Sequence, residues 1–135
     1  METVIFACVR NAGRSQMASA FFNALAAPDR ARSLSAGTQP ADRIHPVVLD
    51  VMREQEIDLS GHRPQRLTES LARGASFLVT MGCGDQCPYV QGLQRDDWPV
   101  PDPRDLAIAE VRLIQADIRR RVMSLIESRG WGRGG

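Results

Sequence analysis

The sequence contains no lysine, because all 17 of its basic residues are arginines. Enzymes that form a Schiff base through a lysine amine are therefore excluded, as are phosphate loops of the Walker type. Cysteine is scarce too: the three residues are Cys8, Cys83 and Cys87. Because an odd number leaves at least one thiol unpaired, a secreted disulfide scaffold is not expected. Catalytic or redox chemistry is the more natural use of these thiols.

Long apolar runs and a strong charge of either sign are also missing. No stretch approaches the ~20 apolar residues of a membrane-spanning helix, and no basic segment followed by an apolar core opens the sequence. We therefore expect a cytoplasmic protein with no membrane partner. The net charge of +1 predicts no nucleic-acid partner, and the run Arg119 to Arg121 is interpreted as a solvated helix face.

The length of 135 residues and the ordinary share of apolar residues, 43%, are typical of one globular domain. We predict a single catalytic domain over residues 1–129 and a flexible tail over 130–135, where glycine is frequent.

Strand-like and helix-like segments alternate along the chain. Strands are expected at 3–8, 33–36 and 76–81, with a poorly marked fourth near 94–98. Helices are expected from Ser15 to the stop at Pro28, from Pro46 onward, after the cap Thr68, and over 106–125. The buried face of the last helix is predicted to comprise Leu106, Ala109, Leu113, Ile118, Val122 and Leu125. This alternation predicts an α/β three-layer sandwich with a four-stranded parallel sheet.

Cys8 is expected at the end of the first strand and Cys83 just past the third. Ligands of parallel sheets bind outside the carboxyl ends of the strands, so both cysteines are predicted to point to the same edge. The segment from Gly82 to Pro103 is long for a connection, and such loops often carry function.

A cysteine and an arginine separated by five residues, Cys8 and Arg14, span the turn from the first strand to the first helix. Five intervening residues can curl so that their N–H groups point inward, which adds to the helix dipole and makes an anion site. Arg14 would hold two oxygens of the anion. The predicted substrate-binding residues are Val9, Arg10, Asn11, Ala12, Gly13, Arg14 and Ser15. The same donors stabilise a thiolate, which makes Cys8 a candidate nucleophile toward an oxyanion.

Other residues have plainer interpretations. Asn11 is expected to orient the loop, and Ser15 either to hydrogen-bond the Cys8 thiolate or to cap the helix. His45 and His62 are interpreted as loop side chains. A closed zinc site needs four ligands, and Cys83 and Cys87 lack a second pair, so no metal site is predicted.

The segment Cys8 to Ala18, CVRNAGRSQMA, resembles the active loop of arsenate reductases built on the low-molecular-weight protein tyrosine phosphatase fold. Further similar segments follow in order and extend the resemblance over about residues 3 to 126. They are Ser35-Ala36-Gly37-Thr38, Ile57-Asp58-Leu59-Ser60, Val79 to Asp85, Cys87-Pro88, and Trp98 with Asp102-Pro103.

This resemblance implies roles for residues that spacing alone does not assign. Asp102 would be the general acid. Cys83 would form the first disulfide with Cys8, and Cys87 would then attack Cys83, so that arsenite leaves and a thioredoxin-like or low-molecular-weight thiol reductant restores the enzyme. No bound cofactor is implied. Ser19 stands where some relatives carry an acidic residue that helps bind potassium, so no potassium site is predicted.

Three alternatives stay open. The same fold serves phosphatases that act on tyrosine phosphate or a small aryl phosphate. A Gly-Cys-Gly-Asp run, here 82–85, also occurs in relatives that transfer arsenate to a low-molecular-weight thiol. Finally, the pocket could bind an oxyanion without turnover and signal through a thiol switch.

Overall fold

The computed structural model describes residues 1–82 and 93–133. These ranges contain four strands: β1 (Glu2–Cys8), β2 (Ala31–Gly37), β3 (Phe77–Thr80) and β4 (Gln94–Asp97). They alternate with α1 (Arg14–Leu25), α2 (Pro46–Arg53), α3 (Glu69–Arg73) and α4 (Ile108–Arg129). The expected order of elements is confirmed, including the weak fourth strand.

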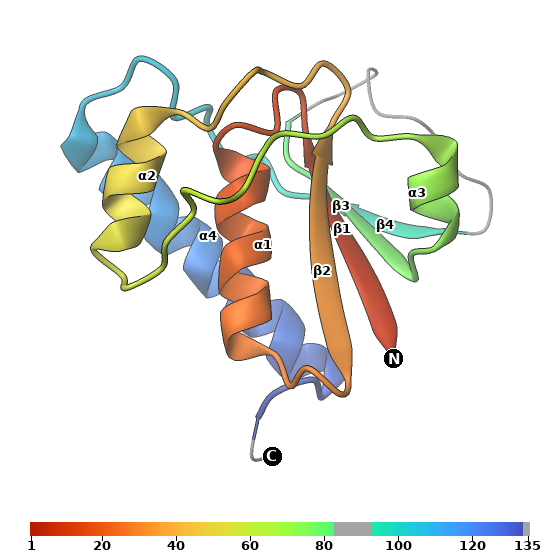
Figure 1. The fold of residues 1–135 in the computed structure, drawn as a ribbon. Helices are drawn as coiled ribbons and strands as arrows, with labels where there is room; N and C mark the ends of the chain where they lie inside the picture. The colour runs from red at the N-terminus through yellow and green to blue at the C-terminus, as the bar shows by residue number, and fades with distance from the viewer. Residues whose placement is uncertain (83–92, 134–135) are drawn as a thin grey trace.

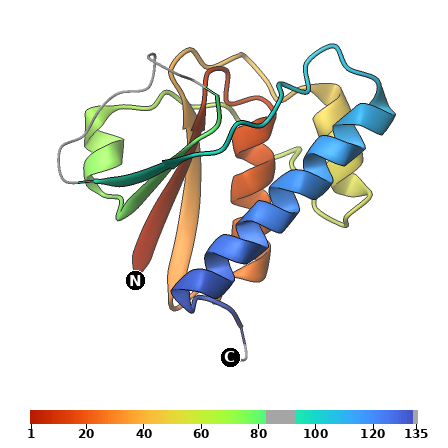
Figure 2. The same cartoon turned by 180° about the vertical axis from the view of Figure 1, so that it is seen from behind.

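The strands form one sheet in the order β2-β1-β3-β4, and every neighbouring pair is parallel. Helices α1, α2 and α4 cover one face and α3 covers the other (Figures 1 and 2). The predicted three-layer α/β architecture with a four-stranded parallel sheet is therefore confirmed. All the strands end at the same edge, from which the loops after β1 and β2 project.

Alternate residues of β1 build the two halves of the core, because side chains along a strand point to opposite faces. Val4 and Phe6 pack with the apolar sides of α1, α2 and α4. Ile5 and Ala7 pack on the other face with a smaller cluster that includes Ala72 of α3. Since β1 is buried on both sides, its sequence is almost continuously apolar, as expected for a central parallel strand.

Trp98 belongs to the larger core cluster. Its ring is 6% exposed, and its centroid lies 5.6 Å from that of Phe6. After α4 the chain turns at Gly130, and Trp131 packs edge-on against Phe22 at 5.8 Å. Aromatic pairs at such distances add to the stability that area burial provides.

Strand β4 was hard to predict because all four of its residues, Gln-Arg-Asp-Asp, are exposed. Its backbone pairs with β3 in register from Phe77 with Gln94 to Thr80 with Asp97. Charged side chains on an edge strand prevent the sheet from pairing with another chain. The strand is thus specified by its backbone partner, with little signal from its side chains.

The buried face of α4 differs from the prediction. Leu106 precedes the helix, Ala109 is exposed, and Leu113 is 73% exposed. The prediction is confirmed for Ile118 and Val122, which are buried, and Leu106 and Leu125 are partly buried against the core. The other buried residues of the helix are Val111, Ile114, Gln115 and Ile126. The predicted stripe mixed two registers, because apolar residues occur on both sides of this helix and only contact with α1 and α2 selects one side.

Candidate active site

Cys8 is the last residue of β1, and its side chain is 2% exposed at the floor of the loop that leads into α1. Its thiol is free. Its sulfur lies 2.9 Å from the hydroxyl oxygen of Ser15. The sequence analysis left two roles open for Ser15, a cap of the helix or a hydrogen bond to the thiol of Cys8. The second arrangement is the one observed, since the helix begins after Gly13 with no side-chain cap.

The carbonyl groups of the loop between Cys8 and Arg14 all accept hydrogen bonds from surrounding segments. The backbone N–H groups of Gln39, Ala41 and His45 donate to the carbonyls of Val9, Arg10 and Ala12 at 2.8, 2.9 and 2.9 Å. The side-chain carboxamide nitrogen of Gln16 donates to Asn11 O at 3.1 Å, and the backbone N–H of Met17 donates to Gly13 O at 3.0 Å. Five consecutive carbonyls are thereby turned away from the centre of the loop.

In a trans peptide, the N–H points opposite to the carbonyl of the same plane, and the described chain has no cis peptide. The N–H groups of residues 10–14 therefore face the inside of the loop. Within the described ranges, 1–82 and 93–133, none of them has a hydrogen-bond acceptor. A ring of unpaired backbone donors at a helix N-terminus is a site for an anion.

Asn11 fixes the curvature of this loop. Its φ of +52° lies in the left-handed region, which asparagine tolerates better than most residues. Its side-chain nitrogen donates to the Ser15 hydroxyl at 2.7 Å. Because that hydroxyl accepts from Asn11, its own proton is available for the sulfur of Cys8.

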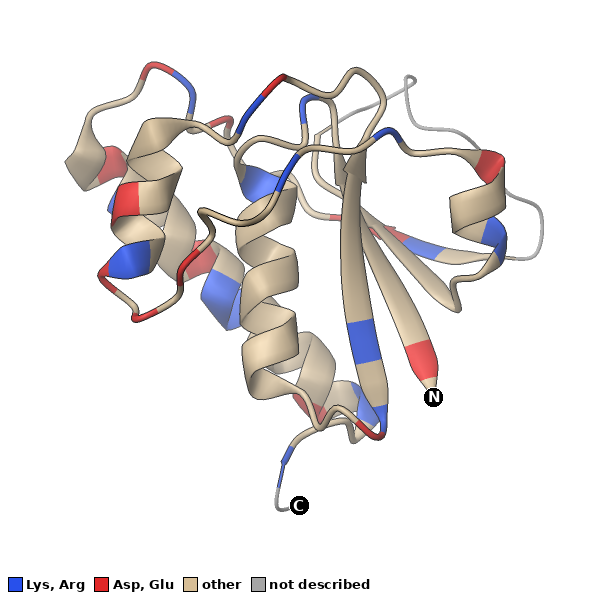
Figure 3. Ribbon diagram, in the orientation of Figure 1, with Lys and Arg blue, Asp and Glu red and all other residues tan. Residues whose placement is uncertain are grey.

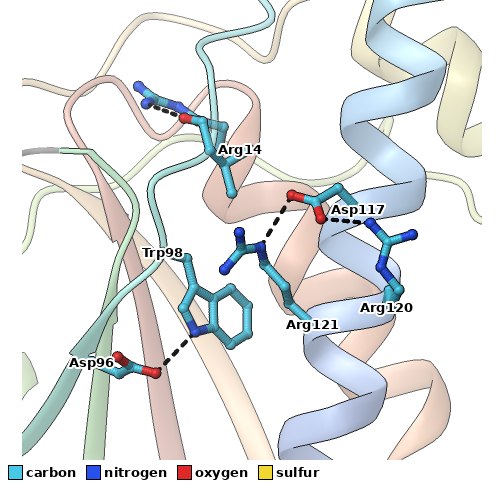
Figure 4. A network of polar contacts seen from close by, with 7 residues as sticks. Arg14, Asp96, Trp98, Asp117, Arg120 and Arg121 are labelled. Carbon is cyan, nitrogen blue, oxygen red and sulfur yellow. Dashed lines mark hydrogen bonds and ion pairs between the residues drawn. The ribbon is translucent and has the colours of Figure 1, made fainter.

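Arg14 is 8% exposed and lies across the opening of the loop. One guanidinium nitrogen donates to the carbonyl of Val100 at 3.1 Å, a bond visible in Figure 4. The other lies 3.9 Å from a carboxylate oxygen of Asp102. The guanidinium also packs on the backbone of Gly82, where an added Cβ would lie 2.6 Å from Arg14 Nη1. Gly82 has a φ of +87°, a value that suits glycine.

Asp102 lies beside the loop with its side chain 45% exposed. One of its carboxylate oxygens accepts the N–H of Arg104 at 3.0 Å and closes a local turn. Pro103 is buried against the loop, since a Cβ added to Gly13 would lie 2.8 Å from Pro103 Cγ. The contact explains why the loop carries glycine at 13, and it holds the carboxylate within reach of the anion site.

His45 is a neighbour of the site that the sequence interpretation missed. Its backbone N–H binds Ala12 O, and its ring carbon Cδ2 lies 3.4 Å from the Cβ position of Gly13. Desolvation by burial lowers the pKa of His45 below its usual 6.5, against the opposing effect of the Asp102 charge. The sequence did contain a signal for the position of His45. Proline favours the first position of a helix, so Pro46 places His45 at the start of α2, which lies at this edge of the sheet.

Exposed arginines surround the loop. They are Arg10, Arg43, Arg63, Arg66 and Arg104, all on loops at this edge. Figure 3 shows several blue segments on the loops at this edge of the sheet, together with a few red, acidic ones. The charges of these arginines attract an anion. The run at 119–121 lies elsewhere, on α4, where Arg120 and Arg121 pair with Asp117 at 2.8 and 3.1 Å (Figure 4).

The structure thus brings together most of the residues that were predicted to form the site: Cys8, Val9, Arg10, Asn11, Ala12, Gly13, Arg14, Ser15 and Asp102. Cys83 and Cys87 lie outside the described residues. Within the described part of the chain, no group of three or more His, Cys, Asp or Glu residues could hold a metal ion. No described helix is long and apolar enough to cross a membrane.

A parallel α/β sheet whose first strand ends in a cysteine, followed by a loop of inward-facing amides and an arginine, makes a site suited to a tetrahedral oxyanion beside a thiol. Comparison with known proteins agrees. The family model described as low molecular weight phosphotyrosine protein phosphatase matches residues 3–129. The chain belongs to this family.

Several relatives in this family have arsenate reductase names. The chain is 35% identical to a putative arsenate reductase of Halobacterium salinarum, over 90% of this chain and 89% of the relative. It is 32% identical to the glutaredoxin arsenate reductase of Synechocystis, over 93% and 97%. Among solved structures, the thioredoxin-dependent arsenate reductase of Corynebacterium glutamicum aligns with a TM-score of 0.80 and 38% identity. That alignment covers 95% of this chain but 61% of the Corynebacterium chain.

Proposed function

We propose that this chain is an arsenate reductase that converts arsenate to arsenite at Cys8. The observation that carries the proposal is the loop in which five carbonyls are bonded outward and the amides face inward around the buried thiol. Arsenate matches this loop as a tetrahedral oxyanion. The arsenate reductase names of relatives that align over nearly the whole chain favour arsenate over other such anions. We assign the activity to a single catalytic domain over residues 1–129.

In the first step, the Cys8 thiolate attacks arsenic and an As–S bond forms. One hydroxyl group of arsenate receives a proton and leaves as water, and Asp102 is the proposed donor because it lies at the mouth of the loop, 3.9 Å from Arg14. The inward amides and the Arg14 guanidinium balance the negative charge on the remaining oxygens. Residues 9–15 form this binding site.

In the second step, the thiolate of Cys83 attacks the sulfur of Cys8. The Cys8–Cys83 disulfide forms, the As–S bond breaks, and its electron pair leaves with arsenic, which is released as arsenite. Cys87 then attacks Cys83 and frees Cys8. The described neighbour of Cys83 in sequence, Gly82, packs on the Arg14 guanidinium, which supports a relay from this segment to Cys8.

An external thiol reductant completes the cycle by reducing the Cys83–Cys87 disulfide. A thioredoxin-like protein is the proposed partner, as the name of the Corynebacterium relative suggests, and a low-molecular-weight thiol system is the second option, as glutaredoxin in the Synechocystis name suggests. In a variant of the second option, the enzyme transfers arsenate to the small thiol itself. Because reductants of this kind keep thiols reduced in the cytoplasm, we propose that the enzyme works there.

The test is NADPH consumption with arsenate as the acceptor, with thioredoxin and thioredoxin reductase in one assay and glutathione with glutaredoxin in another. Turnover with thioredoxin that stops in both Cys83→Ser and Cys87→Ser supports the relay. Turnover with the small thiol that persists in both variants supports arsenate transfer instead. No turnover in either assay contradicts arsenate reduction.

Phosphatase activity is the second candidate, because the matching family model is described by that activity. It requires only water after the Cys8 adduct forms, so hydrolysis of an aryl phosphate should survive when Cys83 and Cys87 are both replaced by Ser. Efficient aryl phosphate hydrolysis without arsenate reduction would establish this alternative. Oxyanion binding with neither reaction would instead indicate a thiol switch.

A further inference from the structure

Gln16 lies in the first turn of α1, behind the loop, and its side chain is almost completely buried at 3% exposure. Its carboxamide nitrogen lies 3.1 Å from both the backbone oxygen and the side-chain oxygen of Asn11. A third oxygen, the carbonyl of Arg63, lies at 3.4 Å. All these contacts are on the outer side of the loop, where its carbonyls point. Gln16 therefore meets the loop where no substrate would touch it.

The direction of every hydrogen bond around Asn11 is set by backbone groups. The carbonyls of Asn11 and Arg63 can only accept, so the Gln16 atom that faces them is the nitrogen. The backbone N–H of Gln65 can only donate, and it lies 2.9 Å from the Asn11 side-chain oxygen, which must therefore be the acceptor.

The other end of the Asn11 amide is consequently the nitrogen, which donates to Ser15 at 2.7 Å. The Ser15 hydroxyl is then left to donate its proton to the sulfur of Cys8 at 2.9 Å. A directed chain of donors runs from Gln16 through Asn11 and Ser15 to the thiol. Each bond in such a chain polarises the next.

We propose that Gln16 is a positioning residue whose carboxamide, acting through Asn11 and Ser15, keeps the Ser15 proton directed at Cys8 and so maintains the reactive thiolate. Gln16 also holds the left-handed turn at Asn11 by binding its carbonyl. The inference deepens the proposed function, because it rests on Cys8 as the nucleophile. It is independent of which oxyanion is used and of the later thiols.

The effect of losing Gln16 should be partial. Asn11 would keep its bond from the Gln65 N–H, so its orientation would become less fixed without being reversed. The loss is indirect, so it weakens the bond from Ser15 to Cys8 without removing it. We therefore expect the rate of Cys8 alkylation at a pH below the midpoint to fall roughly three- to tenfold.

The experiment measures the rate at which iodoacetamide alkylates Cys8 as a function of pH, in the full chain with Cys83 and Cys87 replaced by Ser so that Cys8 is the sole thiol. Gln16→Met keeps the approximate size of the side chain but cannot donate. Gln115→Met is the matched control, because Gln115 is also buried, at 6% exposure, and donates to the carbonyl of Val51 far from the loop. The midpoint should rise in Gln16→Met and stay unchanged in Gln115→Met. An unchanged midpoint in folded Gln16→Met overturns the proposal, as does an equal rise in the control.

Two further variants separate positioning from packing. In a Ser15→Ala background, Gln16→Met should add no further rise, because the chain to the thiol is already broken; additive rises would refute action through Ser15. Gln16→Leu is a second variant that cannot donate, so it should raise the midpoint even if Gln16→Met does not fold, and a wild-type midpoint there refutes the proposal. Alkylation of Cys8 requires no arsenate. If the midpoints rise as expected but the wild-type enzyme does not reduce arsenate, the result counts against the proposed function alone.

Discussion

Replacing Gly82 with alanine should weaken oxyanion binding much more than it weakens the fold. An added Cβ would lie 2.6 Å from Arg14 Nη1, inside any normal contact distance. The arginine side chain is flexible, so it can retreat by roughly 1 Å to restore van der Waals separation. That retreat lengthens its bond to the Val100 carbonyl, now 3.1 Å, and moves the guanidinium relative to the loop.

Two costs of different kind follow from this substitution. The φ of +87° at Gly82 is unfavourable for alanine, and a left-handed conformation destabilises a non-glycine residue by about 1–2 kcal/mol. A displacement of about 1 Å in a binding group can reduce catalysis by about 100-fold. For phosphate used as the test anion, we expect the Kd to rise at least about tenfold, as the charge-assisted bonds of Arg14 lose their alignment.

The assay is protection of Cys8 from alkylation by increasing phosphate, with Cys83 and Cys87 replaced by Ser, together with urea unfolding. Gly130→Ala is the matched control, because Gly130 also has a positive φ, +70°, but a Cβ there meets nothing within 4 Å. Both variants should lose about 1–2 kcal/mol of unfolding free energy, and only Gly82→Ala should lose phosphate affinity. Wild-type phosphate affinity in Gly82→Ala, or an equal loss in both variants, would refute the role assigned to the Gly82 contact.

Three further outcomes are expected. Gly13→Ala would place a Cβ 2.8 Å from the rigid ring of Pro103. Turnover should fall while alkylation of Cys8 persists, and the free energy of unfolding should decrease by about 1–3 kcal/mol. Wild-type turnover in this variant would contradict the expectation. His45 has a lowered pKa because burial desolvates its ring, so the unfolded chain binds a proton at a higher pH than the folded chain does. The free energy of unfolding should therefore fall as the pH drops below 6.5, which urea titrations at several pH values will measure. His45→Gln should flatten that fall, and an unchanged slope would count against His45 as its source. Thr68→Ala removes the cap that accepts the Leu71 N–H at 3.1 Å and should cost about 1 kcal/mol in the same assay, whereas Thr68→Ser should retain most of the stability.

Local sequence determined most of the elements and the core of the site. An uninterrupted apolar run at 4–8 specifies a strand buried on both faces, and the change to helical spacing after Ser15 specifies the first helix. Between strand and helix, five residues separate Cys8 from Arg14. That spacing, together with the strand-to-helix turn, is enough to predict an anion-binding loop. These features depend on neighbours in the chain, which is why they can be read from it.

Other features depend on contacts between segments that are distant in the sequence, and only the tertiary structure decided these. The side of α4 that is buried depends on α1 and α2, so Leu113 is exposed and Val111 is buried although both are apolar. Strand β4 exists because β3 supplies its backbone partners. The direction of the hydrogen bond to Cys8 depends on Gln65, 54 positions from Asn11, and the position of Arg14 depends on Gly82 and Val100. Periodicity and spacing record only local geometry, so these long-range contacts become visible only when the chain is folded.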